Sequence, residues 1–193
     1  AHFMIVNRGC CSLLMRHGTP EQKALIPATL RSDLIWCQLF SEPGAGSDLA
    51  GVRTRAERDG DDWVINGQKI WTSNAQYADW GVLIARIDTS VPKHKGLTFF
   101  IVDMKSKGIE LRPIKQLTGG ANFNEVFFND LRIPDAHRVG EINAGWKVTV
   151  SFLAGERTNI AIKELMPLIG GIVNLARQVQ INGRPAIEDG EVR

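Results

Sequence analysis

The hydrophobic and polar positions of the chain follow three successive patterns. Residues 1–33 carry apolar side chains at helical spacing, and Thr19-Pro20-Glu21-Gln22 predicts a capped helix that runs to about Ser32. From residue 34 to residue 142 the apolar positions form short runs and alternations that are typical of strands. Residues 146 to about 180 then predict a long helix, with a kink or break at Pro167 and Gly170-Gly171.

The middle segment predicts roughly six to eight short strands. Asn66-Gly67 lies between two β-rich runs and predicts a type I′ hairpin turn. Short strands joined by regular turns predict a compact antiparallel β-barrel or sandwich, so the expected fold class is α+β. The main strands are expected at residues 34–40, 53–57, 80–87, 97–103, 109–114 and 125–133.

Composition limits the class of protein without identifying it. The 193 residues are 44% hydrophobic and 23% charged, which indicates a globular chain long enough to bury a core. A net charge of +2 without a basic tract gives no indication of nucleic-acid binding, and no apolar run reaches the length of about 18 residues that a membrane span needs. The chain does not begin with Met and starts within a helical pattern, so we expect a piece of a longer protein.

The cysteines and histidines indicate neither a disulfide framework nor a metal site. Cys10 and Cys11 are adjacent, and Cys37 lies in an apolar run. This is not a zinc spacing, and the four histidines are scattered. We therefore expect no metal and a reducing, cytoplasmic setting.

One stretch combines features of a ligand-binding loop. Residues 38–48, Gln-Leu-Phe-Ser-Glu-Pro-Gly-Ala-Gly-Ser-Asp, leave an apolar run, turn at Pro43 and continue through two glycines to Ser47. Glycines let a ligand approach the backbone closely, and exposed amides followed by a hydroxyl suit an anion. An ordinary Pro-Gly turn between strands would carry the same residues for backbone reasons alone. Taken by itself, the stretch leaves both interpretations open.

Three further stretches, in a fixed order, favour the ligand loop. The chain carries Ser41–Asp48, then Asn66–Asn74, Gly96–Val102 and Val126–Pro134, and together these closely resemble the acyl-CoA dehydrogenases. The resemblance covers nearly the whole chain. It implies the end of an N-terminal helical domain at residues 1–33, a middle β-barrel domain at residues 34–142 and the start of a C-terminal helical domain at residues 143–193.

The resemblance also assigns residues to an FAD and an acyl-CoA. Phe40 and Ser41 would lie near the flavin ring, Ser47 would reach the acyl-CoA, and Trp71 would cover a face of the flavin. Trp71, Thr72 and Ser73 would form one wall of the flavin site, and a hydroxyl of this wall would reach the flavin nitrogen that accepts hydride. Taken alone, Trp71 would be a core residue of a hairpin. The implied cofactor-binding residues are Gln38, Leu39, Phe40, Ser41, Gly46, Ser47, Trp71, Thr72 and Ser73.

The reaction that the resemblance implies is α,β-desaturation of an acyl-CoA thioester. A carboxylate removes the α-proton, the β-hydrogen leaves as hydride to the flavin, and hydrogen bonds stabilise the enolate-like charge. Glu156, in a Glu-Arg pair after the β-domain, is the candidate base. The alternatives are that Glu156 is a solvated helix residue and that the base lies beyond residue 193. The implied substrate-binding residues are Ser47, Glu156 and Arg157.

Three functions are open at this stage. The first is an acyl-CoA dehydrogenase that passes electrons to an electron-transfer flavoprotein or a similar acceptor. The second is an acyl-CoA oxidase or flavin monooxygenase on the same scaffold, and the third is a non-catalytic β-domain. The region Leu117–Asn124 lacks the start seen in several short- and medium-chain members of the family, and Phe123–Val126 is similar to a branch of bacterial enzymes, so the acyl chain is open as well. A homo-oligomer is expected, because FAD commonly bridges subunits in this family.

Overall fold

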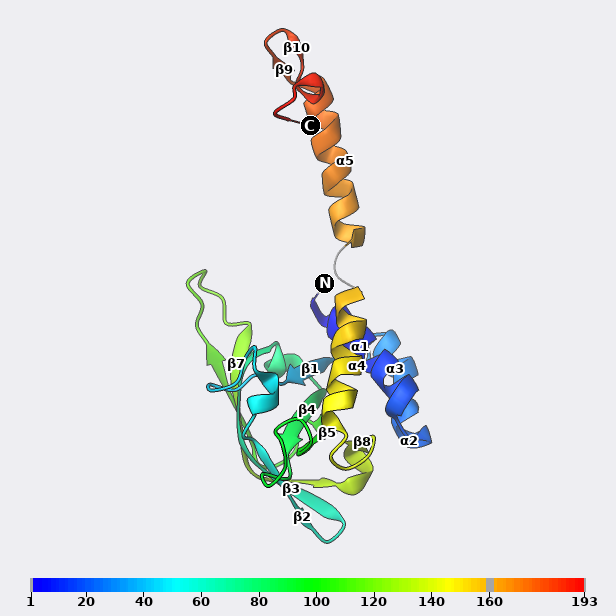
Figure 1. Ribbon diagram of the computed structural model, residues 1–193, viewed down its shortest axis with the longest axis vertical. Helices are drawn as coiled ribbons and strands as arrows, with labels where there is room; N and C mark the ends of the chain where they lie inside the picture. Colours follow the sequence, from blue (N-terminus) through cyan, green and yellow to red (C-terminus); the bar gives the residue numbers. More distant parts are fainter. Residues whose placement is uncertain (1, 159–161, 193) are drawn as a thin grey trace. The chain divides into compact units, whose positions relative to one another are not determined.

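The computed structural model describes residues 2–158 and 162–192, which belong to two compact units (Figure 1). The first unit spans residues 1–158 and the second spans residues 159–193. The three-domain division at residues 33 and 142 stays a prediction.

Three helices open the first unit, α1 at His2–His17, α2 at Pro20–Lys23 and α3 at Ile26–Leu30. The predicted capping box is confirmed: Gln22 N donates to Thr19 Oγ1 at 3.3 Å, and Gln22 Oε1 accepts from Thr19 N at 3.2 Å. The single helix expected up to Ser32 is wrong. Pro27 has no N–H to donate to the carbonyl of Lys23, so the helix cannot continue unbroken from α2 into α3.

The strands of the first unit form one mixed sheet, with the order β6-β7-β3-β2-β4-β5-β8 and with β1 paired to β4. The expectation of a purely antiparallel arrangement is wrong, because β1 and β2 both run parallel to β4. The pairing path ends at β6 and β8, so a closed barrel is not confirmed for the described strands. The strands are β1 Trp36–Leu39, β2 Arg55–Asp59, β3 Asp62–Ser73, β4 Trp80–Arg86, β5 Leu97–Asp103, β6 Ile109–Ile114, β7 Phe123–Pro134 and β8 Arg138–Val139.

The expected hairpin at Asn66-Gly67 is also wrong. β3 passes through these residues without a turn, and its register against β7 shifts between Ile65 and Gly67. Gly67 serves close packing, because a Cβ there would lie 2.6 Å from Thr54 Oγ1. The real turn of this hairpin joins β2 to β3, where Asp59 pairs with Asp62.

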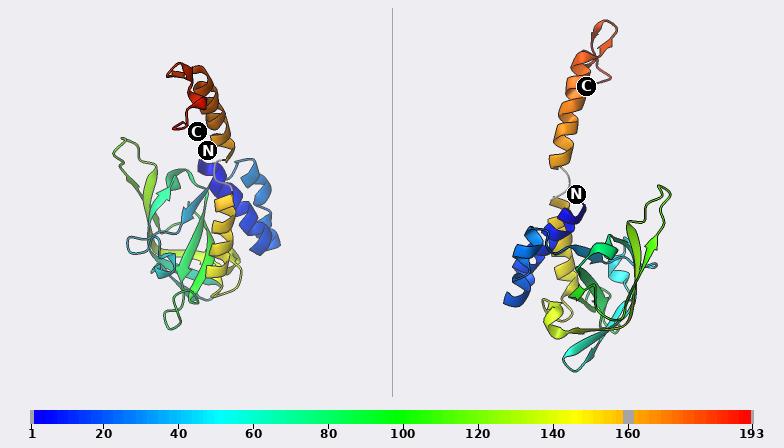
Figure 2. Two further views of the ribbon diagram at one scale, coloured as in Figure 1. Left: turned by 45° about the horizontal axis from the view of Figure 1, so that its top comes forward. Right: turned by 180° about the vertical axis from the view of Figure 1, so that it is seen from behind.

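Two buried apolar clusters cover opposite faces of the sheet. Neighbouring residues of β5 alternate between them: Phe99 belongs to the first cluster and Phe100 to the second. The first cluster also contains Leu13 of α1 and Phe152 of α4, the helix Gly145–Thr158. The helices of this unit therefore pack against one side of the strands, as Figure 2 shows from two directions.

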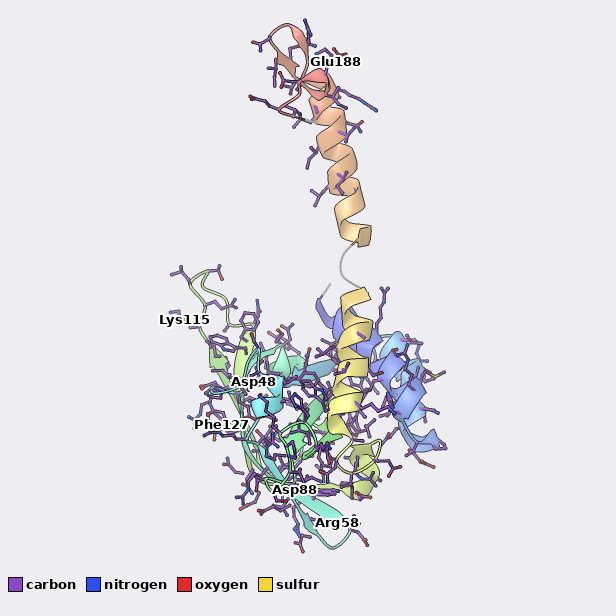
Figure 3. All side chains as sticks on the ribbon, viewed as in Figure 1. Asp48, Arg58, Asp88, Lys115, Phe127 and Glu188 are labelled. Carbon is purple, nitrogen blue, oxygen red and sulfur yellow. The ribbon has the colours of Figure 1, made fainter. Side chains whose placement is uncertain are left out.

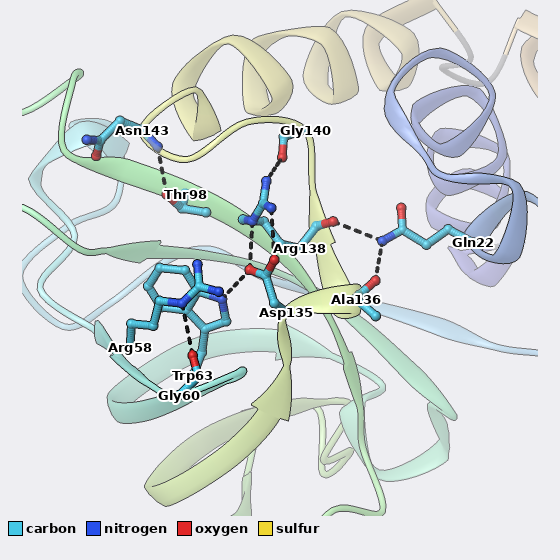
Figure 4. A network of polar contacts seen from close by, with 10 residues as sticks. All are labelled: Gln22, Arg58, Gly60, Trp63, Thr98, Asp135, Ala136, Arg138, Gly140 and Asn143. Atoms are coloured by element: carbon cyan, nitrogen blue, oxygen red, sulfur yellow. Dashed lines mark hydrogen bonds and ion pairs between the residues drawn. The ribbon is translucent and has the colours of Figure 1, made fainter.

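A polar network fastens the end of β7 to the rest of the first unit (Figure 4). Asp135 accepts hydrogen bonds from Trp63 Nε1 at 2.7 Å and from Arg138 Nε at 2.9 Å. Gln22 of α2 donates to the carbonyls of Ala136 at 2.7 Å and Arg138 at 2.9 Å. The network therefore connects a helix, the β2–β3 hairpin and the exit from the sheet.

The long helix expected over residues 146 to about 180 is described in two stretches, α4 up to Thr158 in the first unit and α5 over Ile162–Gln178 in the second. Its expected continuity between them falls on residues 159–161, which lie outside the described residues. α5 continues through Pro167 and the two glycines, so a break at these residues is wrong, and a kink there stays a prediction. The second unit also contains a short hairpin of β9 Gln180–Ile181 and β10 Arg184–Pro185. Single 3₁₀ turns lie at Leu49–Gly51, Ala75–Tyr77, Asp135–His137 and Ala186–Glu188.

None of the helices within residues 2–158 and 162–192 is long and apolar enough to cross a membrane.

Candidate functional site

The two segments that carry the predicted cofactor residues meet in the first unit. Ile70 N, in β3, donates a hydrogen bond to the carbonyl of Ser41 at 2.8 Å. Ser41 follows β1, and the loop continues to Asp48, which Figure 3 labels beside the strands. This backbone hydrogen bond holds two segments side by side that are about 30 positions apart in the chain.

A bulge in β3 makes this contact possible. The register of β3 against β7 shifts between Lys69 and Thr72, and Ile70 and Trp71 have no partner in the ladder. Trp71 adopts a φ of 61°, and its side chain is 57% exposed. Its ring contacts Phe123 edge-on, with the centroids 6.2 Å apart. The bulge therefore presents a large aromatic ring to solvent from the interior of a strand.

Thr72 follows Trp71 in β3. Its side chain is buried, and its Oγ1 has no hydrogen-bond partner in the structure. Its carbonyl accepts a bond from Asn124 Nδ2 at 3.2 Å, and the same nitrogen donates to Gln76 Oε1 at 2.5 Å. Ser73 ends β3 opposite Phe123 and is half-buried. A buried hydroxyl without a partner is uncommon, and Thr54 Oγ1 is a second example among the described residues.

The loop from Gln38 to Ser47 divides into buried and accessible parts. Leu39 and Phe40 are buried in the two apolar clusters, so only their backbones could contact a ligand. The half-buried residues are Gln38 and Ser41, and Gly46 and Ser47 are exposed. A Cβ at Gly46 would meet no atom within 4 Å, so the space in front of this glycine is open.

The ordinary turn that the sequence left as an alternative is present within this loop. Glu42 and Ala45 exchange two backbone hydrogen bonds, of 2.9 and 3.0 Å, around Pro43-Gly44. The turn does not exclude a ligand, because Ser41 before it and Ser47 after it are both accessible.

Sequence reasoning missed a buried ion pair at the base of this loop. Lys69 Nζ lies 2.8 Å from Glu42 Oε1, and the side chains are 0% and 7% exposed. The local pattern showed only a lysine in a β-rich run, which is usually exposed. The signal that could have located the pair is its place in the two motifs. Glu42 opens the Pro-Gly turn of the first motif, and Lys69 comes directly before Ile70-Trp71 of the second, where the structure has the bulge.

A basic surface pocket next to the loop was also missed. It has a volume of about 490 Å³, and four of its lining residues are Arg53, Arg55, Arg86 and Lys93. Lys93 Nζ reaches both carboxylate oxygens of Asp48 at 2.8 Å. The four cations come from β2, β4 and the segments beside them, so they are brought together only by folding.

The candidate base, Glu156, lies in helix α4, and the structure describes its backbone but not its side chain. Glu156 and Arg157 are in the last turn of α4, and no contact of either side chain is described. Their roles stay predictions. Within the described residues, no group of three His, Cys, Asp or Glu side chains could hold a metal ion.

Comparison with known proteins identifies the family of this architecture. Residues 37–131 match the family model "Acyl-CoA dehydrogenase, middle domain". The acyl-CoA dehydrogenase FadE34 of Mycobacterium tuberculosis is 45% identical over 185 residues, which are 91% of this chain and 26% of that protein. The acyl-CoA dehydrogenase IpdE1 of the same organism is 41% identical over 180 residues, 91% of this chain and 47% of that protein.

Solved structures agree with these relatives. A structure described as the Tcur3481-Tcur3483 steroid ACAD superposes with a TM-score of 0.80 at 38% identity, over 91% of this chain and 46% of that one. The chain thus spans between a quarter and a half of the proteins that it matches here. The order of the motifs, the matched middle domain and the superposition are consistent with one another, and the chain belongs to the acyl-CoA dehydrogenase family.

Proposed function

We propose that the intact protein catalyses FAD-dependent α,β-desaturation of an acyl-CoA thioester. The observation that carries this proposal is the Ile70–Ser41 hydrogen bond of 2.8 Å, which joins the two segments that family resemblance assigns to the flavin. Membership of the acyl-CoA dehydrogenase family supports the same activity.

The residues present fit a flavin on two counts. Trp71 offers an exposed aromatic ring, and the half-buried Ser73 offers a hydroxyl that can hydrogen-bond a heteroatom of a bound ring. We propose that FAD is held by Trp71, Thr72 and Ser73, by the backbone of residues 38–40, and by Ser41, Gly46 and Ser47. When bound, FAD supplies the acceptor for the hydrogen and the electron pair that leave the β-carbon.

The acyl-CoA would be bound on the side of Ser47. Its hydroxyl is exposed at the end of the loop, and the following residue, Asp48, is paired with Lys93 of the basic pocket. Coenzyme A carries phosphate groups, and a cluster of arginine and lysine side chains suits them. The basic pocket therefore supports a binding mode in which the phosphate groups of the coenzyme A part lie over β2.

The proton step is assigned to Glu156, by resemblance and by its place in α4. Its carboxylate would take the α-proton, and Arg157 would bind the substrate or anchor the carboxylate. α4 packs against the sheet through Phe152, one helical turn before Glu156, which supports a position on the substrate side of the β-domain.

The remaining expectations belong to the same proposal. An electron-transfer flavoprotein or similar carrier would accept the electrons, and the intact enzyme would be a homo-oligomer. A cytoplasmic setting agrees with Cys10, Cys11 and Cys37, which are buried and form no disulfide within the described residues. One similar structure is described as a steroid ACAD, so steroid side-chain thioesters belong among the substrates to test.

The test is a substrate screen on the intact protein with bound FAD. Wild type is expected to desaturate at least one straight-chain, branched or steroid side-chain acyl-CoA with a dye or flavoprotein acceptor. Glu156→Gln is expected to lower the rate roughly a hundred- to ten-thousand-fold while FAD stays bound. Glu141→Gln, at an exposed position before α4, is the matched control and should leave the rate unchanged.

Two results would contradict parts of the proposal. Turnover of Glu156→Gln near the wild-type rate would place the base elsewhere. Stoichiometric peroxide formed from acyl-CoA in air would instead indicate an oxidase on this scaffold.

A further inference from the structure

The ammonium group of Lys69 has three oxygen partners in the interior. Nζ donates to the carbonyl of Phe40 at 3.1 Å, to Glu42 Oε1 at 2.8 Å and to the carbonyl of Ile84 at 2.9 Å. An ammonium has three donor hydrogens, so all of them are used. The side chain is fully buried, and each contact reaches a different part of the chain: the end of β1, the loop after it, and β4.

The carboxylate of Glu42 also has three hydrogen-bond partners. Besides Lys69, it accepts from the backbone N–H of Arg53 at 2.6 Å and of Thr54 at 2.9 Å. Burial raises the pKa of this carboxyl, but the charge and the hydrogen bonds of Lys69 and the neighbouring donors outweigh that effect and lower it. Glu42 is therefore ionised at neutral pH and is a fixed counter-ion.

A buried ion pair such as Lys69–Glu42 contributes little net stability to a fold. The cost of removing both charges from water is of the same order as their attraction, and apolar replacements of similar volume are often neutral or stabilising. Burial lowers the pKa of Lys69 to about 8, and Glu42 offsets part of the shift. The pair therefore calls for an explanation other than stability, and its location supplies one.

Lys69 lies where the two walls of the proposed flavin site meet. Phe40, whose carbonyl it binds, directly precedes Ser41, and Lys69 itself directly precedes the bulge of Ile70 and Trp71. We propose that Lys69 is a positioning residue, which fixes the Phe40–Glu42 backbone against the Ile70–Ser73 segment so that both walls hold one flavin. This inference rests on the proposed function and adds a residue to its site.

The experiment compares three variants of the intact protein. Lys69→Met removes all three bonds at similar volume but leaves the Glu42 carboxylate buried and unpaired. The double variant Glu42→Gln/Lys69→Met removes both charges and so recovers part of the stability, yet the carbonyls of Phe40 and Ile84 still lack the Lys69 donor. Arg31→Met removes an exposed ion pair with Asp33, outside the loop of residues 38–48, and is the matched control.

The readouts are the Kd for FAD, the visible spectrum of the bound flavin and the urea midpoint. We expect the double variant to unfold at a urea midpoint between those of Lys69→Met and wild type, to bind FAD about tenfold or more weakly and to show a shifted flavin spectrum, since losing one buried charge-assisted bond is worth about a factor of ten. Lys69→Met should lose both stability and affinity, and Arg31→Met neither.

The outcomes separate the two proposals. A double variant with wild-type FAD affinity and spectrum would overturn the role of Lys69. A wild-type protein that does not bind FAD at all would instead overturn the proposed function.

Discussion

The backbone of Trp71 adopts a φ of 61°, a conformation that costs an L-residue about 1–2 kcal/mol. The other described non-glycine residues with positive φ are serine, asparagine or aspartate, whose short side chains tolerate this region better, namely Ser32, Asn74, Asp130, Asn143 and Asn182. A bulky ring kept there while 57% exposed is not explained by packing. A ligand stacked on the ring would explain why this strain is retained.

Asp135 is the residue at which pH acts most directly on stability. Its hydrogen bonds from Arg138, joined by the one from Trp63, lower the pKa of the carboxyl from 3.8 to about 2 against the effect of burial. A carboxyl whose pKa is lowered by folding stabilises the fold above its unfolded pKa and loses that contribution as the pH falls towards its folded pKa. We predict that Asp135→Asn lowers the free energy of unfolding by about 1–2 kcal/mol at neutral pH. The difference should narrow below about pH 4.

Urea unfolding of both proteins from neutral to acidic pH checks this prediction. Asp61→Asn, at an exposed position in the neighbouring β2–β3 turn, is the control and should change stability by less than about 0.5 kcal/mol. A deficit of Asp135→Asn that stays constant across the pH range would show that lost packing, and not charge, is responsible.

Among the residues of the proposed site, the sequence motifs predicted Trp71 and Thr72 but not the buried Lys69. Trp71 and Thr72 were predicted from a motif, but the left-handed backbone of the one and the unpartnered hydroxyl of the other depend on the bulge. Lys69 was missed because its role is defined by the carbonyl of Phe40, 29 positions away, and that of Ile84, 15 positions away. Contacts of this kind leave no local pattern.

At the scale of elements, β3 organises the first unit. It pairs with β2 on one side and β7 on the other, and it contains two register shifts against β7. The second shift presents Trp71, and the first lies at Gly67, where the strand passes close to Thr54. A continuous strand with two bulges bends more than a regular one, and each bulge redirects the side chains that follow it.

Gly67 allows this close approach and is expected to tolerate no side chain. A Cβ there would lie 2.6 Å from Thr54 Oγ1 and 2.7 Å from Thr54 Cα, which belongs to the backbone and cannot simply rotate away. We predict that Gly67→Ala lowers the free energy of unfolding by about 2–3 kcal/mol. Urea unfolding measures the loss.

Gly60→Ala is the matched control for this substitution. Gly60 has a φ of 63° in the β2–β3 turn, but a Cβ there would meet nothing within 4 Å. Gly60→Ala should lower the free energy of unfolding by only about 1 kcal/mol, because backbone strain is its only cost. Equal losses for the two alanine variants would contradict the steric account of Gly67.

Sequence located elements well where burial is regular. β5 and β6 have the predicted bounds, because continuous apolar or alternating runs end at turn residues on both sides. Asn66-Gly67 was misassigned because a glycine required for a bulge and a glycine required for a hairpin turn look alike in a short window. Only the partner strands β2 and β7 distinguish the two cases.

At the scale of the first unit, the order of the strands could not be predicted. β1 pairs in parallel with β4, with Trp36 opposite Trp80, across more than 40 positions of the chain. Local patterns predict that strands exist but not which strands pair, so the sequence favoured the simpler antiparallel barrel. The succession of helices, strands and helices was predicted correctly, because each change of hydrophobic period is visible locally.

Phe152 joins the helices of this unit to the loop of the proposed site. Its ring is 1% exposed and contacts the Phe40 ring at a centroid distance of 5.6 Å, one residue before Ser41. It also fills the space over Gly9 of α1, where a Cβ would lie 2.9 Å from the ring. The ring therefore links α4, α1 and the end of β1 in one packed contact.

We predict that Phe152→Ala in the intact protein lowers the free energy of unfolding by about 3–5 kcal/mol. The substitution leaves a cavity between α4, α1 and the end of β1, and these packed elements can relax into it only in part. It should also weaken FAD binding, since Phe40 would lose the contact that fixes the start of the loop. Val150→Ala, 48% exposed on the same helix, is the control and should affect neither quantity. Urea unfolding and FAD titration measure the two effects. A large loss of stability with unchanged FAD affinity would mean that Lys69 and β3 hold the loop without help from α4.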